Sequence, residues 1–310
     1  MVSSFNKVKI RRWILLLAIC TNPYGFAQTW SILDPFPNSD PYTTIYTGLS
    51  GNNFVGYYSF NGSVRGFLKN NNTWLNIITP EGSNFLPEGI DGSNIIGSVS
   101  TANGTQSYVF NLANNSWSQL VNTNAQGVFA YGISGNKIVG ELSFQVGSNK
   151  GFIFDGNSWT ILSPPVGLNQ GDYSKANDID GDSVVGFYGN GTFIYNNGAY
   201  QKIGNIANAT WNTQKVDGIF NSKIIGSYID SSGGNERGYI FEGSTFLNID
   251  AFDNNQNATK LRDISDDKIL GYYWDVNSSG NFLYIIPEPS ALSLITVSLG
   301  ALALVRRRRS

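Results

Sequence analysis

The chain has 310 residues, and its 20 Lys plus Arg nearly balance its 22 Asp plus Glu, for a formal net charge of −2. It contains no histidine and only one cysteine. These counts exclude serine–histidine catalysis, imidazole acid–base chemistry and the usual zinc and copper ligand sets. We therefore predict a non-enzymatic protein with no catalytic residue, no metal site and no cofactor.

The first 27 residues have the order of a secretory signal peptide. Four basic residues within Lys7–Arg12 precede the apolar run Trp13–Cys20, and a small-residue site ends at Ala27. We predict cleavage between Ala27 and Gln28, which removes the only cysteine and leaves no disulfide. A lipoprotein anchor at that cysteine is the alternative, although Ile19 stands where such a signal normally has a small residue.

The body of the chain is acidic. Between Gln28 and Ile286 there are 12 Lys plus Arg and 21 Asp plus Glu, a net charge of −9. Because no basic patch is available to neutralise phosphates, we predict no nucleic-acid partner. This body of about 260 residues is long enough to bury a substantial core.

One sequence unit occurs six times in this body. Its most regular element is a glycine that ends an aliphatic pair, at spacings of 41, 43, 46, 40 and 45 residues, with another aliphatic residue seven positions earlier. An offset that is kept six times indicates a structural repeat. The six glycines are Gly56, Gly97, Gly140, Gly186, Gly226 and Gly271.

Each unit continues in a way that predicts four antiparallel strands. Downstream of each repeat glycine an aromatic residue recurs in a Gly-Phe-like step, as in Gly151-Phe152, and most units then carry a second aromatic residue seven positions later. Turn formers such as Ser134-Gly135-Asn136 separate the short β-branched and aromatic runs. We assign the aromatic residues of the last strand to packing, not to a binding stripe; they include Trp74, Trp117 and Trp159.

The sixth unit lacks its last strand, because Phe282-Leu283-Tyr284 runs almost directly into Pro287. The missing spacing occurs at the other end of the body, in Trp30-Ser31-Ile32-Leu33. A ring whose ends pair leaves no open sheet edge. We therefore predict an all-β fold over residues 28–286, a six-bladed β-propeller closed by the mature N-terminal strand. The alternative is an open array such as a β-solenoid, which needs capping repeats that neither end resembles.

The repeat also resembles that of bacterial extracellular proteins with an Ile-Val-Gly and Gly-Phe pattern of similar length. The resemblance rests on Ile138-Val139-Gly140 and Gly151-Phe152. It implies an extracellular repeat fold and indicates no reaction.

The links between units each carry a large aromatic residue, and in a propeller such links cross the face where ligands usually bind. Flat aromatic rings there can pack on sugar rings, and we single out Phe129, Tyr173 and Trp211 as possible ligand-binding residues. The alternative is that the link aromatics seal the joints between neighbouring blades. The five residues are Phe85, Phe129, Tyr173, Trp211 and Phe252.

The densest acidic cluster is Asp178, Asp180 and Asp182. Alternate carboxylates beside a glycine can ligate calcium. The same position in other units holds ordinary turn residues, so we interpret these aspartates as turn formers and predict no metal site. The same interpretation applies to the equivalent turn of the last unit, which holds Asp263, Asp266 and Asp267.

The chain ends with Pro287, Glu288 and Pro289, an apolar run over 290–305, and a cluster of four arginines before Ser310. As a helix, the sixteen apolar residues reach about 24 Å, nearly the hydrocarbon thickness of a bilayer, which predicts a single transmembrane helix. The positive-inside rule then places the body outside the cell. The four arginines are Arg306, Arg307, Arg308 and Arg309.

This ending resembles the PEP-CTERM sorting signal of Gram-negative bacteria. The resemblance covers Pro287 to Arg309 and implies an exosortase-type membrane enzyme as a partner, transient anchoring in the inner membrane, and delivery to the cell surface or extracellular matrix. A plain tail anchor is the alternative.

These features favour a surface or matrix protein whose propeller binds polysaccharide or another protein without catalysis. Two alternatives stay open at this point. One is a carboxylate-dependent glycosidase or polysaccharide lyase, because glycoside hydrolysis needs only two carboxylates. The other is a structural spacer without a specific ligand.

Overall fold

The computed structural model describes residues 29–79, 84–101, 104–163, 173–189, 191–207, 209–210, 213–232, 234–251, 258–274 and 278–286. The predicted signal peptide, the cleavage site at Ala27 and Gln28, the sorting signal at 287–310 and Trp211 lie outside these residues. Within the described ranges, no helix is long and apolar enough to cross a membrane.

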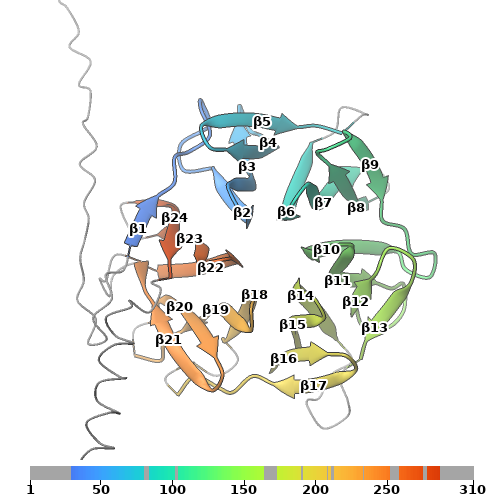
Figure 1. The fold of residues 1–310 in the computed structure, drawn as a ribbon, viewed down its shortest axis with the longest axis vertical. Helices are drawn as coiled ribbons and strands as arrows, with labels where there is room; N and C mark the ends of the chain where they lie inside the picture. Colours follow the sequence, from blue (N-terminus) through green and yellow to red (C-terminus); the bar gives the residue numbers. More distant parts are fainter. Residues whose placement is uncertain are drawn as a thin grey trace, which may run out of the picture.

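The described residues form six four-stranded antiparallel sheets arranged as blades around a central axis (Figure 1). This confirms the predicted all-β, six-bladed propeller. Blades 1 to 3 consist of β2 (Ile45–Ser50), β3 (Asn53–Phe60), β4 (Ser63–Asn70) and β5 (Thr73–Ile77); β6 (Phe85–Asp91), β7 (Asn94–Thr101), β8 (Gly104–Asn111) and β9 (Ser116–Gln119); and β10 (Gly127–Ser134), β11 (Lys137–Ser143), β12 (Lys150–Phe154) and β13 (Trp159–Leu162).

Blades 4 to 6 follow the same order of strands from the axis outward, except that the outermost strand of blade 6 is the first strand of the chain. They consist of β14 (Ser174–Asp180), β15 (Ser183–Tyr188), β16 (Gly191–Asn196) and β17 (Ala199–Lys202); β18 (Lys215–Phe220), β19 (Lys223–Ile229), β20 (Glu236–Glu242) and β21 (Thr245–Ile249); and β22 (Ala258–Ser265), β23 (Lys268–Trp274), β24 (Ser279–Ile285) and β1 (Thr29–Ile32).

The ring closes where β1 pairs with β24, as predicted. Trp30 lies opposite Tyr284 in the antiparallel register, and its ring packs 4.6 Å from that of Tyr284 and 5.0 Å from that of Phe282. The buried side chain of Asn281 extends the seam to blade 1, because it donates to Thr44 O at 2.7 Å and accepts from Tyr46 N at 3.1 Å. The closed ring excludes the solenoid alternative.

The core lies between neighbouring blades. Val139 of blade 3 is fully buried in one apolar cluster with Ala176 and Ile179 of blade 4. The repeat glycine that follows it, Gly140, sits where a β-carbon would lie 1.9 Å from Phe129 O, so any larger residue would clash with the backbone of the inner strand. The aliphatic residue before the glycine therefore packs against the next blade, while the glycine allows the two inner strands of its own blade to lie close together.

The aromatic residues of the outer strands pack within their own blades, as predicted. Trp117 stacks on Phe110 with ring centroids 4.5 Å apart and meets Phe85 edge to face at 5.1 Å. Trp159 similarly contacts Phe152 at 4.9 Å, and Trp74 contacts Phe67 at 5.2 Å. These contacts explain why an aromatic residue recurs at this position.

Candidate functional site

Each innermost strand contains a β-bulge at the same position. In β6, for example, the pairing with β7 shifts between Pro87 and Gly89, which leaves Glu88 unpaired at the axis of the ring. Bulges of this kind change the direction of a side chain and are enriched near functional sites. The six unpaired residues, here called the bulge ring, are Thr47, Glu88, Tyr131, Asn177, Asp217 and Arg262.

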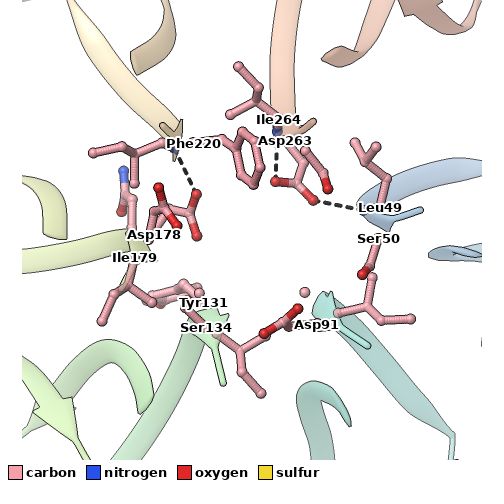
Figure 2. Close-up of a pocket in the computed structure, with 18 of the residues that line it drawn as sticks. Leu49, Ser50, Asp91, Tyr131, Ser134, Asp178, Ile179, Phe220, Asp263 and Ile264 are labelled. Atoms are coloured by element: carbon pink, nitrogen blue, oxygen red, sulfur yellow. Dashed lines mark hydrogen bonds between the residues drawn. The ribbon is translucent and has the colours of Figure 1, made fainter. Parts of the chain in front are cut away.

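The bulge ring lines a cavity of about 170 Å³ at the centre of the propeller (Figure 2). The residue after each bulge lies eight positions before the repeat glycine, and in four blades it is also glycine. The position is crowded, since a β-carbon on Gly132 would lie 2.6 Å from Asp178 Cα. Blades 4 and 6 depart from this pattern, because they carry Asp178 and Asp263 there.

Both aspartates connect their blade to the next one. Asp178 Oδ2 accepts from Ile219 N of blade 5 at 2.8 Å. Asp263 Oδ2 accepts from Leu49 N of blade 1 at 2.7 Å, which adds a second link across the junction of the two chain ends. In Figure 2 the two carboxylates face the same cavity from blades 4 and 6.

The two carboxylates influence each other's protonation. Burial raises the pKa of Asp263 to about 7. Burial, and then the neighbouring charge of Asp263, raise the pKa of Asp178 well above its usual value. Because burial disfavours the charged form and a second negative charge is disfavoured beside the first, the pair retains a proton to a higher pH than a free aspartate does.

A second ring of residues lies two positions before the bulge on each inner strand, at one end of the channel. This ring, here called the mouth ring, is divided in two: blades 1 to 3 contribute apolar residues and blades 4 to 6 contribute lysines. The apolar half is Ile45, Leu86 and Phe129, and the lysine half is Lys175, Lys215 and Lys260.

The two lysines at the ends of the lysine half are held in surroundings that disfavour charge. Lys175 Nζ lies 3.7 Å above the ring of Tyr131 in the neighbouring blade. Burial lowers the pKa of both Lys175 and Lys260. Burial also raises the pKa of Glu88 to about 7, although Lys175 and Arg262 oppose this shift.

Two of the three predicted ligand-binding residues lie together at this mouth. Phe129 on β10 is paired with Glu141 on β11, and the Tyr173 hydroxyl donates to Glu141 Oε2 at 3.2 Å. Burial and the adjacent Glu141 raise the pKa of Tyr173 to about 12. Their role in binding stays a prediction, and Trp211 lies outside the described residues.

The other link aromatics have different outcomes. Phe85 is fully buried among residues of blades 1 and 2, as the joint-sealing alternative requires. Phe252 lies outside the described residues.

The turn interpretation of the aspartates is confirmed for some and wrong for others. Asp182, Asp266 and Asp267 lie in turns, and Asp182 pairs with Lys137. Asp178, Asp180 and Asp263 instead lie in strands. Asp180 ends β14 and accepts from Asn221 N of the next blade at 2.7 Å, whereas Asp178 and Asp263 follow the bulges of β14 and β22 and line the central cavity. No group of three acidic residues in the described part of the chain could hold a metal ion.

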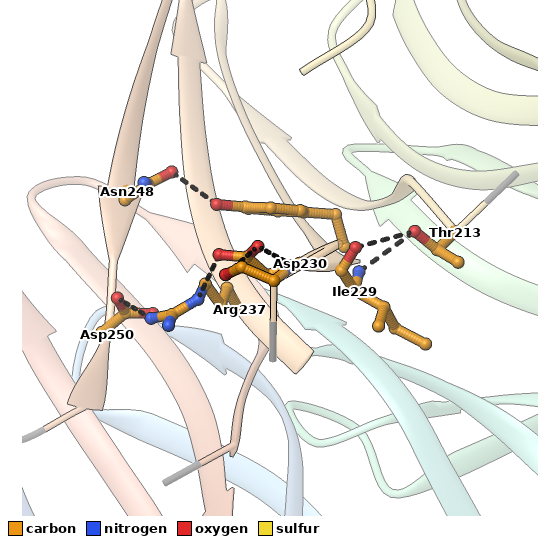
Figure 3. Close-up of polar contacts among 8 residues, drawn as sticks. Thr213, Ile229, Asp230, Arg237, Asn248 and Asp250 are labelled. Atoms are coloured by element: carbon orange, nitrogen blue, oxygen red, sulfur yellow. Dashed lines mark hydrogen bonds and ion pairs between the residues drawn. The ribbon is translucent and has the colours of Figure 1, made fainter. Parts of the chain in front are cut away.

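The rim of blade 5 shows how a cation is neutralised elsewhere in this fold (Figure 3). Arg237 on β20 pairs with Asp230 at 3.1 Å and with Asp250 at 2.7 Å. Beside it, the Tyr228 hydroxyl donates to Asn248 Oδ1 at 3.1 Å. These contacts fix the connection after β19 against the end of β21.

Comparisons with known proteins give no match in sequence and distant matches in structure. No family model matches the chain, and no curated protein matches it in sequence. The β-propeller domain of the Trilobed protease from Pyrococcus furiosus matches with a TM-score of 0.49 at 12% identity, over 78% of this chain and 81% of that one.

Two further solved structures match with similarly low TM-scores and sequence identities. An acylaminoacyl peptidase from Pyrococcus horikoshii matches with a TM-score of 0.46 at 12% identity; the match covers 78% of this chain but only 45% of the peptidase. A mutant Aleuria aurantia lectin in complex with Fucalpha1-6GlcNAc matches with a TM-score of 0.42 at 14% identity, over 82% of this chain and all of the lectin.

Proposed function

We propose that this chain is an exported protein, sorted through its PEP-CTERM-like ending, whose propeller binds polysaccharide at the mouth of the channel without cleaving it. The observation that carries the proposal is the cluster of Phe129, Glu141, Tyr173 and Lys175 at one end of the ring. Aromatic faces, a carboxylate and an amine are brought together there by two neighbouring blades.

The chemistry of this cluster suits a sugar. Aromatic faces pack on the C–H faces of a pyranose ring, while a carboxylate accepts hydrogen bonds from sugar hydroxyls and a lysine donates them. Phe129 is half-buried and Glu141 already accepts from Tyr173, so the groups are pre-positioned. Pre-positioning reduces the entropy lost on binding.

Binding is tested by retention of the purified protein on a panel of bacterial exopolysaccharides. We expect retention on at least one polymer and a loss of at least tenfold in affinity for Tyr173→Ala, without new reducing ends. The matched control is Leu75→Ala, since Leu75 is half exposed on the outer strand β5. Absence of retention on every polymer, or equal weakening by both variants, would contradict the proposal.

Sorting is tested separately from binding. Replacement of Pro287, Glu288 and Pro289 by alanine is expected to leave uncleaved protein in the membrane fraction. The control is replacement of the adjacent Ser290 by alanine, which leaves the tripeptide intact. Unchanged processing of the triple variant would favour the plain tail anchor.

A carboxylate-dependent glycosidase is the second candidate, because Asp178 and Asp263 line one cavity and burial raises the pKa of both carboxyl groups. A glycosidase needs one protonated and one ionised carboxylate. Both side chains, however, accept main-chain N–H groups of the next blade, which is a structural role. New reducing ends that disappear in Asp178→Asn would establish the enzymatic alternative in place of the binding one.

A further inference from the structure

We propose that the mouth of the channel recognises an acidic sugar, with the carboxylate of a uronic acid held by the lysine half and the sugar face against the apolar half. This inference rests on the proposed polysaccharide binding and adds the class of ligand. It follows from the placement of charge around the ring.

The first observation is the division of the mouth ring. Three consecutive blades place apolar side chains at one register position, and the next three blades place lysines there. In an acidic body this is a concentration of positive charge, because four of its 12 Lys plus Arg lie at the mouth ring or directly below it: Lys175, Lys215, Lys260 and Arg262.

The second observation is that three of these four cations are not neutralised by direct contact. Lys215 pairs with Glu236 at 3.6 Å. Among the described residues, Lys175, Lys260 and Arg262 form no ion pair within 4 Å, and Arg262 Nε is buried with no hydrogen-bond partner. In contrast, Arg237, on strand β20 of blade 5, forms ion pairs with two carboxylates.

The nearby acids act on Lys175, Lys260 and Arg262 only at a distance, because none of them forms an ion pair within 4 Å with these three cations among the described residues. The charge of Glu141 acts on Lys175, and that of Glu236 acts on Lys260 while Glu236 itself pairs with Lys215. Glu88 and Asp217 lie one layer deeper, in the bulge ring, and burial raises the pKa of both. These three cations are partly withdrawn from water, and Arg262 Nε has no hydrogen-bond partner, so a ligand carboxylate that supplies the missing contact would be bound favourably.

The apolar half accounts for the remainder of the ligand. Phe129 lies in the mouth ring next to Lys175 and three blades from Lys260, and Tyr131, one layer below Phe129, already has Lys175 over its ring. A pyranose ring presents C–H groups on one face, and its C6 carboxylate projects from the edge. Such a ligand places each group against the half of the mouth that suits it.

The test is calorimetric titration of the full exported chain with oligogalacturonate, with its methyl-esterified form of equal length, and with sulfated dextran. We expect the acid to bind at least tenfold more tightly than the ester, with an affinity that falls as salt rises. Lys260→Met should remove this difference. Lys202→Met is the matched control, because Lys202 is exposed on the outer strand β17.

The outcomes separate this inference from the proposed function. Equal binding of the acid and its ester would overturn the acidic-sugar assignment and leave polysaccharide binding intact. Tighter binding of sulfated dextran than of oligogalacturonate would overturn the carboxylate assignment. Retention on no polysaccharide of the exopolysaccharide panel would overturn the proposed function itself. The melting temperatures of both lysine variants are compared with that of the wild type, so that lost binding is not mistaken for unfolding.

Discussion

The seam that closes the propeller and the channel at its centre differ in how strictly the repeat fixes the residue type at equivalent positions. At the seam, Trp30 takes the place that Trp74 and Trp159 occupy in their blades, and it packs on the aromatic residues of β24. At the channel, the bulge ring has a different residue type in each of the six blades. Packing within a blade constrains the side chain, whereas the axis tolerates variation.

The largest expected effect comes from removing the seam's aromatic residue. Trp30→Ala leaves a void against Phe282 and Tyr284, and we expect the free energy of unfolding to fall by about 3 kcal/mol. Urea unfolding measures the change. Ile32→Ala on the same strand is the control, because Ile32 is 53% exposed and its truncation should cost less than about 0.5 kcal/mol. Equal losses would mean that the backbone pairing of β1 with β24, and not the indole ring of Trp30, holds the closing strand in blade 6.

We expect the contribution of the channel to the free energy of unfolding to depend on pH, unlike that of the aromatic seam. The pKa of Glu88 in the folded protein is about 7, above the usual carboxyl value of 4.5, so the folded state holds a proton that the unfolded state releases first. Its contribution to stability is complete below pH 4.5 and is lost as pH rises through 7, by at most about 3 kcal/mol.

The comparison of wild type with Glu88→Gln isolates this contribution. We expect the variant to gain stability relative to wild type as pH rises from about 4.5 to 8, as measured by urea unfolding at each pH. Because Asp178 and Asp263 titrate in both proteins, their contribution cancels in the difference between the two free energies of unfolding. A constant offset across this range would show that Glu88 does not titrate with the fold.

A smaller loss of stability is expected when the link between blades 6 and 1 at the channel is removed. Asp263→Ala removes the acceptor of Leu49 N, which links blade 6 to blade 1, and should cost about 2 kcal/mol because a buried N–H loses its partner. The measurement belongs below pH 7, where the repulsion between the two aspartates is small. Asp267→Ala in the exposed turn is the control, and a loss no larger than the control's would contradict the linking role.

Much of the fold could be read from local pattern. The spacing of Gly140 and its equivalents, the outer-strand tryptophans and the early Trp30 segment each depend on contacts within one blade or with its neighbour, so the same residue types recur. The aspartates show the limit of this approach. Asp178 and Asp263 were assigned to turns because their neighbours are turn formers, whereas the bulge places them on the axis. Their departure from glycine, eight residues before Gly186 and Gly271, was the available signal.

The amino-acid sequence by itself determined the number of blades, the strands of each and the closing segment, because five units carry the whole hydrophobic and turn pattern and the Trp30 segment supplies the part that the sixth unit lacks. Only the tertiary structure decided which side chains meet at the axis. Glu88, Lys175 and Arg262 come from blades 2, 4 and 6, and residues so far apart along the chain become neighbours only when the ring is closed. The charge balance of the mouth is therefore a property of the assembled ring.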